Sequence, residues 1–144
     1  MSTDFVFSRL LDKQSEPIQL TAPVAVSELP TPALVLERSI LQRNIESMRD
    51  FLAAEGKGFR PHSKTHKCPV IAKLQMEAGA VGVCAAKLSE AVALINSGLT
   101  KILITSPIVS KSKLEILINV LPRGSDHDIN IVIDSMIGLE RLLE

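Results

Sequence analysis

Tryptophan and tyrosine are absent from the 144-residue chain, and phenylalanine occurs only four times. Proteins that bind single-stranded nucleic acid usually stack the bases on aromatic rings, so this scarcity argues against that class. A basic surplus is also absent, because 16 lysine and arginine residues balance 16 aspartate and glutamate residues. Proteins that bind DNA or RNA normally carry such a surplus. We therefore expect no nucleic-acid partner.

Cysteine is scarce as well, because only Cys68 and Cys84 occur, too few for a disulfide framework. No apolar run approaches the ~18 residues needed to cross a bilayer. Charged residues interrupt the beginning of the chain, where a signal peptide would be apolar. These features predict a cytoplasmic protein with reduced thiols and no membrane partner. The chain is 46% hydrophobic and 22% charged, which suits one domain with a core.

Short apolar runs alternate with amphipathic segments from residue 31 onward. Each amphipathic segment spaces its apolar residues as a helix does. Pro69 suits the first turn of the second helix. Capping boxes are predicted at Ser39 with Gln42 and at Ser112 with Glu115. The apolar runs are typical of buried strands and cover residues 32–36, 58–64, 80–86, 101–105 and 129–134.

The order of these segments predicts the fold class. Residues 1–28 show no period and are expected to form an N-terminal arm, with a short helical turn near residues 5–11. Residues 29–144 follow the order βαβαβαβαβα, which indicates an α/β fold with a parallel sheet covered by helices. An open doubly wound sheet and a (β/α)8 barrel both have this order. Because a whole barrel takes roughly 250 residues, five βα units would be part of one.

Residues 60–68 read RPHSKTHKC and gather most of the reactive side chains at the end of the second expected strand. Reactive residues collect at such strand ends in parallel α/β folds. One interpretation is a solvated basic loop. A second is a metal site formed by His62, His66 and Cys68, although no carboxylate lies nearby in the sequence. The third is a nucleophilic Lys64, whose uncharged amine would be favoured by partial desolvation and neighbouring cations and could form a Schiff base.

Two stretches carry a resemblance to a known family: TPALVL at residues 31–36, and RPHSKTHKCPVIAKLQMEAGAVGVCAAKLSEA at residues 60–91. They resemble the D-threonine aldolase family, which is related to eukaryotic-type D-serine dehydratases and, more distantly, to alanine racemases. These are fold-type III pyridoxal phosphate (PLP) enzymes, in which a (β/α)8 barrel precedes a β-rich domain. The resemblance implies that residues 29–144 form a partial PLP-binding (β/α)8 barrel of the alanine racemase N-terminal type.

The resemblance also assigns roles to individual residues. In the family, the first lysine of an RPHxKTHK segment holds the cofactor, and that position is Lys64 here rather than Lys67. Side chains alternate along a strand, which would place Lys64 on the barrel wall. His62 and His66 are implied as cofactor-binding residues, and loop histidines bonded to the backbone are the open alternative.

Three other polar or reactive residues near the expected strand ends have simpler explanations. Glu90 falls in the first turn of a helix, where a carboxylate complements the helix dipole. Cys84 suits an inert core position. Asp134 ends the fifth expected strand and could meet a cofactor or substrate, but a helix cap explains it better.

The implied activity is that of a PLP-dependent lyase, which cleaves D-β-hydroxy-α-amino acids to glycine and an aldehyde. The expected partner is therefore a small D-amino acid. Family members also use a divalent metal, whose ligands lie in a C-terminal domain that these residues do not include, so the chain resembles a fragment too short to act alone. The alternatives are a D-serine dehydratase-like or racemase-like PLP protein, or a noncatalytic α/β module that binds an anion or a partner. The open edges of a partial barrel predict self-association or a complementing chain.

Overall fold

The computed structural model describes residues 6–7, 18–19, 22–121 and 127–143. Its contacts divide the chain into a first unit, Met1–Asn44, and a second unit, Ile45–Glu144. In the first unit, strand β1 (Val6–Phe7) pairs antiparallel with β2 (Ile18–Gln19), and the 3-10 helix η1 (Val26–Glu28) follows. The helical turn expected near residues 5–11 does not form at Val6–Phe7, because these residues form strand β1. The other residues of the expected turn lie outside those described. The predicted division into an arm (1–28) and a barrel domain (29–144) stays a prediction.

The strand expected at residues 32–36 is not formed. These residues have no regular secondary structure, and the side chain of Leu34 is fully exposed. A strand requires a neighbouring strand to pair with, and no other strand pairs with this stretch in the part of the chain that the structure describes. Apolar composition alone was therefore an insufficient signal for a strand here.

Helix α1 (Arg38–Ala54) forms where the helical spacing predicted it. Its predicted capping box is wrong, because Ser39 already lies inside the first turn. The carboxylate of Glu37 accepts hydrogen bonds from the Ser39 backbone N–H, at 3.0 Å, and from the Ser39 hydroxyl, at 2.5 Å. An acidic side chain just before a helix satisfies free N–H groups and complements the helix dipole.

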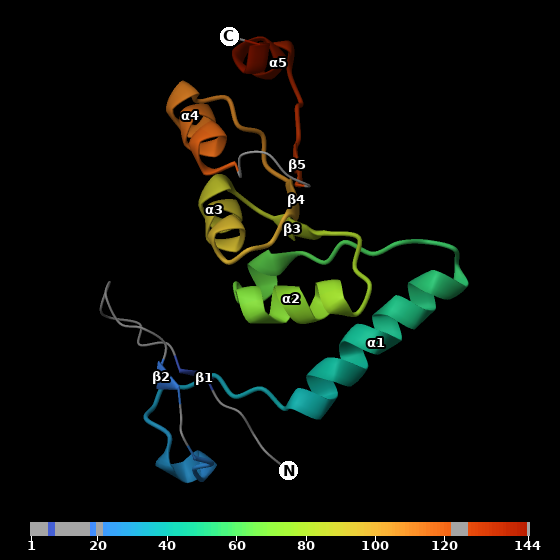
Figure 1. Ribbon diagram of the computed structural model, residues 1–144, viewed down its shortest axis with the longest axis vertical. Coiled ribbons are helices and arrows are strands. Elements are labelled where there is room, and N and C mark those ends of the chain that lie inside the picture. The colour runs from blue at the N-terminus through green and yellow to red at the C-terminus, as the bar shows by residue number, and fades with distance from the viewer. Residues whose placement is uncertain (1–5, 8–17, 20–21, 122–126, 144) are drawn as a thin grey trace. The chain divides into compact units, whose positions relative to one another are not determined.

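The second unit alternates strands and helices as predicted, and its three strands form a parallel sheet in the order β3-β4-β5 (Figure 1). The expected strands at residues 80–86, 101–105 and 129–134 are confirmed as β3, β4 and β5. Helix α2 begins at Pro69, as predicted. The elements are η2 (Ser63–Thr65), α2 (Pro69–Glu77), β3 (Val83–Ala85), α3 (Leu88–Asn96), β4 (Lys101–Ile104), α4 (Lys111–Val120), β5 (Asp128–Ile131) and α5 (Met136–Leu143).

Two of these helices are capped differently from the prediction. Helix α4 has Ser110 as its N-cap residue, so the capping box expected at Ser112 is wrong; the hydroxyls of Ser110 and Ser112 lie 2.9 Å apart. At α5, the Ser135 hydroxyl accepts the backbone N–H of Gly138 at 3.1 Å. Ser135 rather than Asp134 is therefore the capping side chain of α5.

The strand expected at residues 58–64 is not formed, and only an isolated bridge at His62 remains of it. Backbone N–H groups of Val81 and Cys84 donate to the carbonyls of Phe59 and Pro61, at 2.9 and 2.8 Å, and His62 forms a single parallel bridge with Cys84. Pro61 has no N–H to extend the ladder. The chain then turns into η2, so Lys64 lies in a 3-10 turn and not on a strand.

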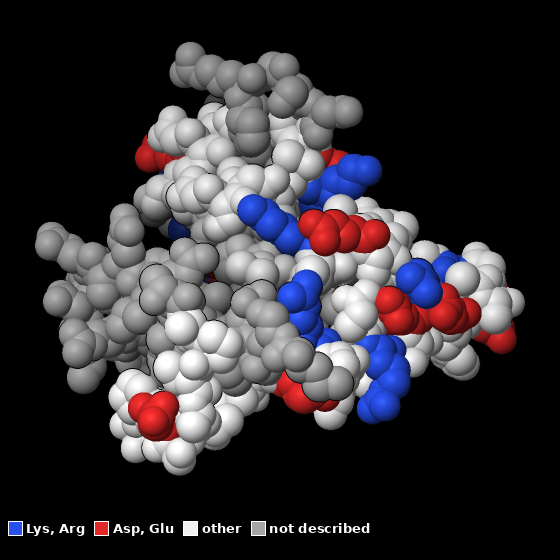
Figure 2. All heavy atoms as spheres, turned by 60° about the horizontal axis from the view of Figure 1, so that its bottom comes forward, with Lys and Arg blue, Asp and Glu red and all other residues white. Residues whose placement is uncertain are grey.

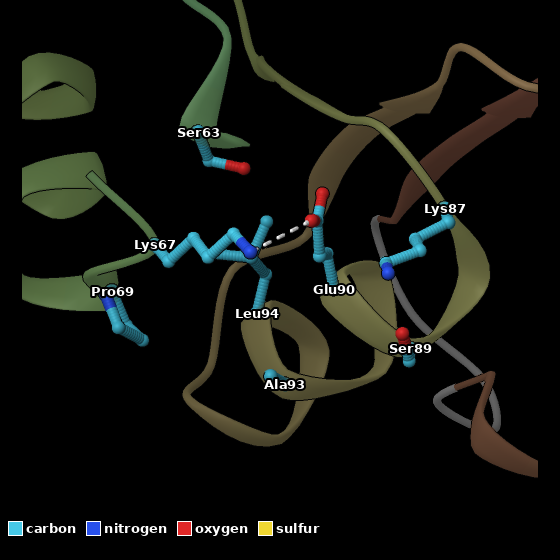
Figure 3. A pocket seen from close by; sticks show the side chains of 8 residues that line it. All are labelled: Ser63, Lys67, Pro69, Lys87, Ser89, Glu90, Ala93 and Leu94. Carbon is cyan, nitrogen blue, oxygen red and sulfur yellow. Dashed lines mark ion pairs between the residues drawn. The ribbon is translucent and has the colours of Figure 1, made fainter. Parts of the chain in front are cut away.

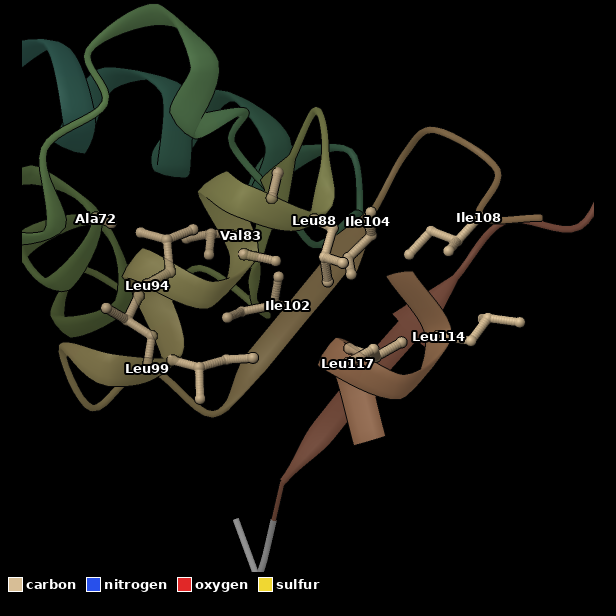
Figure 4. Close-up of a cluster of buried hydrophobic side chains, with 13 residues drawn as sticks. Ala72, Val83, Leu88, Leu94, Leu99, Ile102, Ile104, Ile108, Leu114 and Leu117 are labelled. Carbon is tan, nitrogen blue, oxygen red and sulfur yellow. The ribbon is translucent and has the colours of Figure 1, made fainter. Parts of the chain in front are cut away.

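One face of the sheet carries the core (Figure 4). Parallel register aligns Val83 with Ile102 and Ala85 with Ile104, and all four side chains are fully buried. They belong to one cluster with apolar residues of the neighbouring helices. These helical residues are Ala72 of α2, Leu88, Ala91, Leu94 and Ile95 of α3, and Leu114 and Leu117 of α4. Helices α3 and α4 therefore cover this face.

On the opposite face of the sheet, Cys84 and Leu103 are half-buried and Asn130 is exposed. Arg60 crosses this face, because a Cβ added to Gly82 would lie 2.2 Å from Arg60 Nη1 and 2.9 Å from the Lys101 carbonyl oxygen. The guanidinium Nη2 also lies 3.7 Å from Oδ2 of Asp128, at the start of β5. Only glycine leaves room for this crossing. Arg60 thus reaches from residues 58–62 across β3 and β4 to β5.

The surface charges agree with the balanced composition. On the face shown in Figure 2, basic and acidic side chains lie interspersed rather than in one patch of a single sign. None of the helices in the described segments is both long and apolar enough to cross a membrane.

Candidate functional site

The carboxyl ends of neighbouring strands bring His62 and Thr105 together. His62 Nε2 lies 3.3 Å from the Thr105 hydroxyl, although the two residues are 43 positions apart. The Thr105 hydroxyl donates to the carbonyl oxygen of Ala85 at 3.1 Å, and the Thr105 backbone N–H donates to the same oxygen at 2.9 Å. Parallel strands gather such side chains at one edge. His62 is therefore connected to the ends of both β3 and β4.

The second ring nitrogen of His62 contacts the backbone of Lys64. Its Nδ1 accepts the Lys64 N–H at 3.3 Å. Burial lowers the pKa of His62, the charge of Lys64 lowers it further, and Glu90 acts in the opposite direction. Because Nδ1 accepts a hydrogen bond, the proton of the neutral ring lies on Nε2. In its neutral form, His62 thus accepts the Lys64 N–H and positions the turn η2.

Lys64 itself is exposed at this strand end. The preceding residue, Ser63, is 3% exposed, and its hydroxyl donates to the Cys84 carbonyl oxygen at 2.8 Å. No carboxylate among the described residues lies within 4.0 Å of the Lys64 amine. The Lys64 backbone is therefore held through Ser63 and at its own N–H, while its side chain is exposed.

Lys67 is in a different environment. Its backbone has a left-handed φ of 49°, and its N–H donates to the Ser63 carbonyl at 2.7 Å. Its Nζ lies 3.9 Å from Oε1 of Glu90, as the dashed line in Figure 3 marks. Glu90 also accepts the Ala86 N–H at 2.8 Å, so its carboxylate satisfies the backbone before α3. The geometry therefore pairs Lys67 with a carboxylate.

A pocket of ≈ 330 Å³ lies beside this ion pair (Figure 3). Neither Lys64 nor the two histidines line it. Lys67 enters it from the segment before α2, and Lys87 and Glu90 enter it from the beginning of α3. The remaining lining residues are Ser63, Pro69, Ser89, Ala93 and Leu94. The pocket thus adjoins η2 at Ser63, but the side chains of His62, Lys64 and Thr105 do not line it.

His66 does not join His62. Its Nδ1 accepts the Cys68 N–H at 3.0 Å, and its Nε2 is buried without a partner of normal geometry among the described residues. Burial lowers the pKa of His66, against the opposing effects of the Gln75 side chain and the Cys68 backbone. Two of the three sequence-predicted site residues, His62 and Lys64, therefore interact, whereas His66 is held by its own loop.

The shifted pKa of His66 gives a prediction about acid stability. The unfolded chain takes up a proton near the ordinary pKa of 6.5, whereas the folded chain resists protonation. Stability from this residue is therefore complete above that pH and is lost as the pH falls below it. We expect His66→Asn, which offers an acceptor to Cys68 without titrating near neutral pH, to weaken the loss of stability on acidification. Urea unfolding from about pH 7.5 to about pH 5 measures this effect. An identical pH dependence in the two proteins would contradict it.

The structure does not assemble a metal site from His62, His66 and Cys68, the ligands of the metal interpretation. Within the described residues, no group of three or more histidine, cysteine, aspartate or glutamate side chains is placed to hold a metal ion. The Nδ1 atoms of His62 and His66 already accept backbone hydrogen bonds. The other cysteine, Cys84, is half-buried, and burial raises the pKa of its thiol. A thiol with this shift is a poor nucleophile and a poor ligand.

Sequence reasoning missed Thr105. The residue ends the apolar run at residues 101–105, where a small polar side chain directly after a buried strand is a weak signal. Its hydrogen bond to His62 depends on parallel register across β3, which no local pattern reveals. Together these residues define an α/β protein that presents a lysine amine at the carboxyl ends of parallel strands.

Comparison with known proteins identifies the family. The model for "Alanine racemase, N-terminal domain" matches residues 36–144, so the chain belongs to that family, in its D-threonine aldolase-like group of PLP enzymes. A 3-hydroxy-D-aspartate aldolase from Paracoccus denitrificans is 38% identical over 100 residues, which cover 69% of this chain and 26% of that protein. The resemblance stated above is therefore confirmed.

Solved structures agree with this assignment. The D-threonine aldolase from Filomicrobium marinum superposes with a TM-score of 0.76 at 37% identity, over 81% of this chain and 31% of that one. The D-threo-3-hydroxyaspartate dehydratase from Delftia sp. HT23 gives 0.71 at 32% identity, over 80% and 30%. The prediction of a partial barrel is confirmed. The chain spans about a quarter to a third of the length of these relatives.

Proposed function

We propose that this chain carries the cofactor lysine of a PLP-dependent lyase of the D-threonine aldolase type. The substrates would be D-β-hydroxy-α-amino acids, which the lyase cleaves to glycine and an aldehyde. The observation that carries the proposal is Lys64, whose amine is exposed at a strand end while hydrogen bonds at Ser63 and at its own N–H hold its backbone. Membership of the family supports the choice of cofactor.

The residues present fit the aldehyde end of PLP. An aldehyde binds a primary amine that it can reach, and the Lys64 side chain is exposed and has no carboxylate within 4.0 Å of its amine among the described residues. Lys67 fits less well, because its amine is directed to Glu90. The fit concerns the aldehyde end alone. By resemblance, the phosphate and the metal would be bound by parts of the enzyme outside these 144 residues.

Within this chain, each residue has a limited role. When bound, PLP supplies an electron sink for the bond that breaks at Cα. Lys64 Nζ would bind the aldehyde carbon and keep the cofactor at the strand ends. His62 is not suited to accept a proton, because protonation of Nδ1 would remove the acceptor of the Lys64 N–H. His62 would therefore orient the lysine rather than act as a general base.

Replacing Lys64 with arginine tests this proposal. Arginine keeps the positive charge, but its guanidinium does not form the covalent bond with the aldehyde. With PLP added, the natural chain should develop the visible absorption band of a lysine-bound cofactor, Lys64→Arg should lack it, and the matched control Lys67→Arg should keep it. A band that survives in Lys64→Arg and disappears in Lys67→Arg would contradict the assignment. The absence of a band in the natural chain would favour a noncatalytic module.

We also propose a cytoplasmic location, which the two free cysteines Cys68 and Cys84 support. The dehydratase-type alternative would use the same lysine, and the higher identity to the aldolases favours cleavage over dehydration.

Self-association, or pairing with a chain that supplies further βα units, is a further part of the proposal. In the described part of the chain, β5 pairs with β4 alone. Met136, Ile137 and Leu143 of α5 are 69%, 62% and 79% exposed. Burying such surface stabilises by about 25 cal/mol per Å². We expect the sedimentation coefficient to rise with concentration, and the rise to be smaller in Ile137→Glu. A sharp monomer at micromolar concentration would contradict this expectation.

A further inference from the structure

We propose that Thr105 is a positioning residue for Lys64, because its hydroxyl fixes His62 in the tautomer whose Nδ1 holds the Lys64 backbone. This inference rests on the proposed function, since positioning Lys64 matters only if Lys64 binds the cofactor. It adds Thr105, the residue directly after β4, to a site that the sequence pattern confined to residues 60–68.

The hydrogen-bonding capacity of the hydroxyl fixes the direction of the contact. A threonine hydroxyl has one proton, and here that proton is donated to the Ala85 carbonyl oxygen at 3.1 Å. Toward His62, at 3.3 Å, the hydroxyl can therefore only accept. Nε2 must then carry the ring proton.

The other side of the ring requires the same tautomer. The Lys64 backbone N–H is a donor, and its 3.3 Å contact with Nδ1 requires that nitrogen to be unprotonated. Both contacts are long for hydrogen bonds, so each is weak alone. Thr105 and Lys64 contact opposite sides of the imidazole ring, and both contacts require the same neutral tautomer. Each contact therefore stabilises the other.

This arrangement ties the turn η2 to two strands. Ser63 attaches it to β3 through the Cys84 carbonyl, and His62 attaches it to the end of β4 through Thr105. Thr105 is itself fixed, because its N–H and its hydroxyl both donate to Ala85. Loss of the hydroxyl should free the ring to change tautomer or rotate, and the Lys64 N–H would then lose its acceptor. The amine would remain but would be less well placed for an aldehyde.

Thr105→Val and Thr105→Ser form the matched pair that tests the inference. Valine keeps the shape and removes the hydroxyl, whereas serine keeps the hydroxyl. Imidazole ¹⁵N NMR of the cofactor-free chain, with His62 assigned through His62→Gln, should show the Nε2–H tautomer in the natural chain and in Thr105→Ser. Thr105→Val should show a mixture. The rate of lysine adduct formation with limiting PLP should fall about tenfold in Thr105→Val and recover in Thr105→Ser.

The outcomes separate this inference from the proposed function. Thermal unfolding first establishes that each variant is folded. A natural chain with the Nδ1–H tautomer, or a Thr105→Val variant with unchanged tautomer and unchanged adduct rate, would overturn the role of Thr105. If no variant forms an adduct, the proposed function fails. In that case the tautomer alone decides the contact, because a mixture in Thr105→Val supports the fixed tautomer and an unchanged Nε2–H form overturns it.

Discussion

Replacing Ile102 with alanine is expected to lower the free energy of unfolding by about 2–5 kcal/mol. Ile102 lies on β4, the central strand of the parallel sheet, and its side chain is fully buried in the cluster covered by α3 and α4. Truncation removes apolar contacts and leaves a cavity that the surrounding residues fill only in part. Since a domain is stable by only ~5–15 kcal/mol, this loss is a large share of the total.

Urea unfolding measures this effect, and Ile118→Ala is the matched control. Ile118 lies on α4 but is 67% exposed, so its truncation should change the stability by less than about 0.5 kcal/mol. Equal losses in the two variants would mean that the sheet face against α3 and α4 is not the core of the second unit.

A polypeptide limited to these 144 residues is expected to release glycine from D-threonine at least about a thousandfold more slowly than a typical enzyme. It carries the proposed cofactor lysine, but it spans only 31% of the solved D-threonine aldolase. Catalysis by residues that act as a unit is lost far more than additively when most of them are missing.

The measurement is a glycine assay with D-threonine, PLP and a divalent metal. The Filomicrobium marinum D-threonine aldolase, with its full length, is the positive control. Turnover by the 144-residue chain at about 1 s⁻¹ or faster would show that the lysine-bearing units are sufficient for the reaction.

The sequence was a good guide to the fold where each signal was local and repeated. Apolar runs near residues 83 and 102 became β3 and β4, and Pro69 began α2. Residues 32–36 have an equally apolar composition but form no strand, because a strand also depends on a pairing partner. The capping side chain of α1 is Glu37, which lies two positions before the predicted Ser39. Both side chains can accept hydrogen bonds from free helical N–H groups, and only the geometry of the folded chain decides between them.

Only part of the candidate site could be predicted, because sequence patterns reveal contacts between residues that are close in the chain. The RPHSKTHKC motif drew attention to Lys64 and His62, which are close in the sequence and interact in the fold. Thr105 is 43 residues from His62, and only the parallel register brings the two together. The orientation of His66 toward Cys68 depends on the loop conformation, which composition does not reveal.

The central claim is that Lys64 binds the cofactor, and borohydride reduction tests it most directly. The natural chain is mixed with PLP, reduced, digested and mapped by mass spectrometry. Reduction makes the bond between the amine and the aldehyde carbon permanent, so the modified residue is read without any need for turnover. We expect label on Lys64, whose amine has no carboxylate partner among the described residues, and little label on Lys67, which faces Glu90. Label on Lys67 with Lys64 unmodified would contradict it.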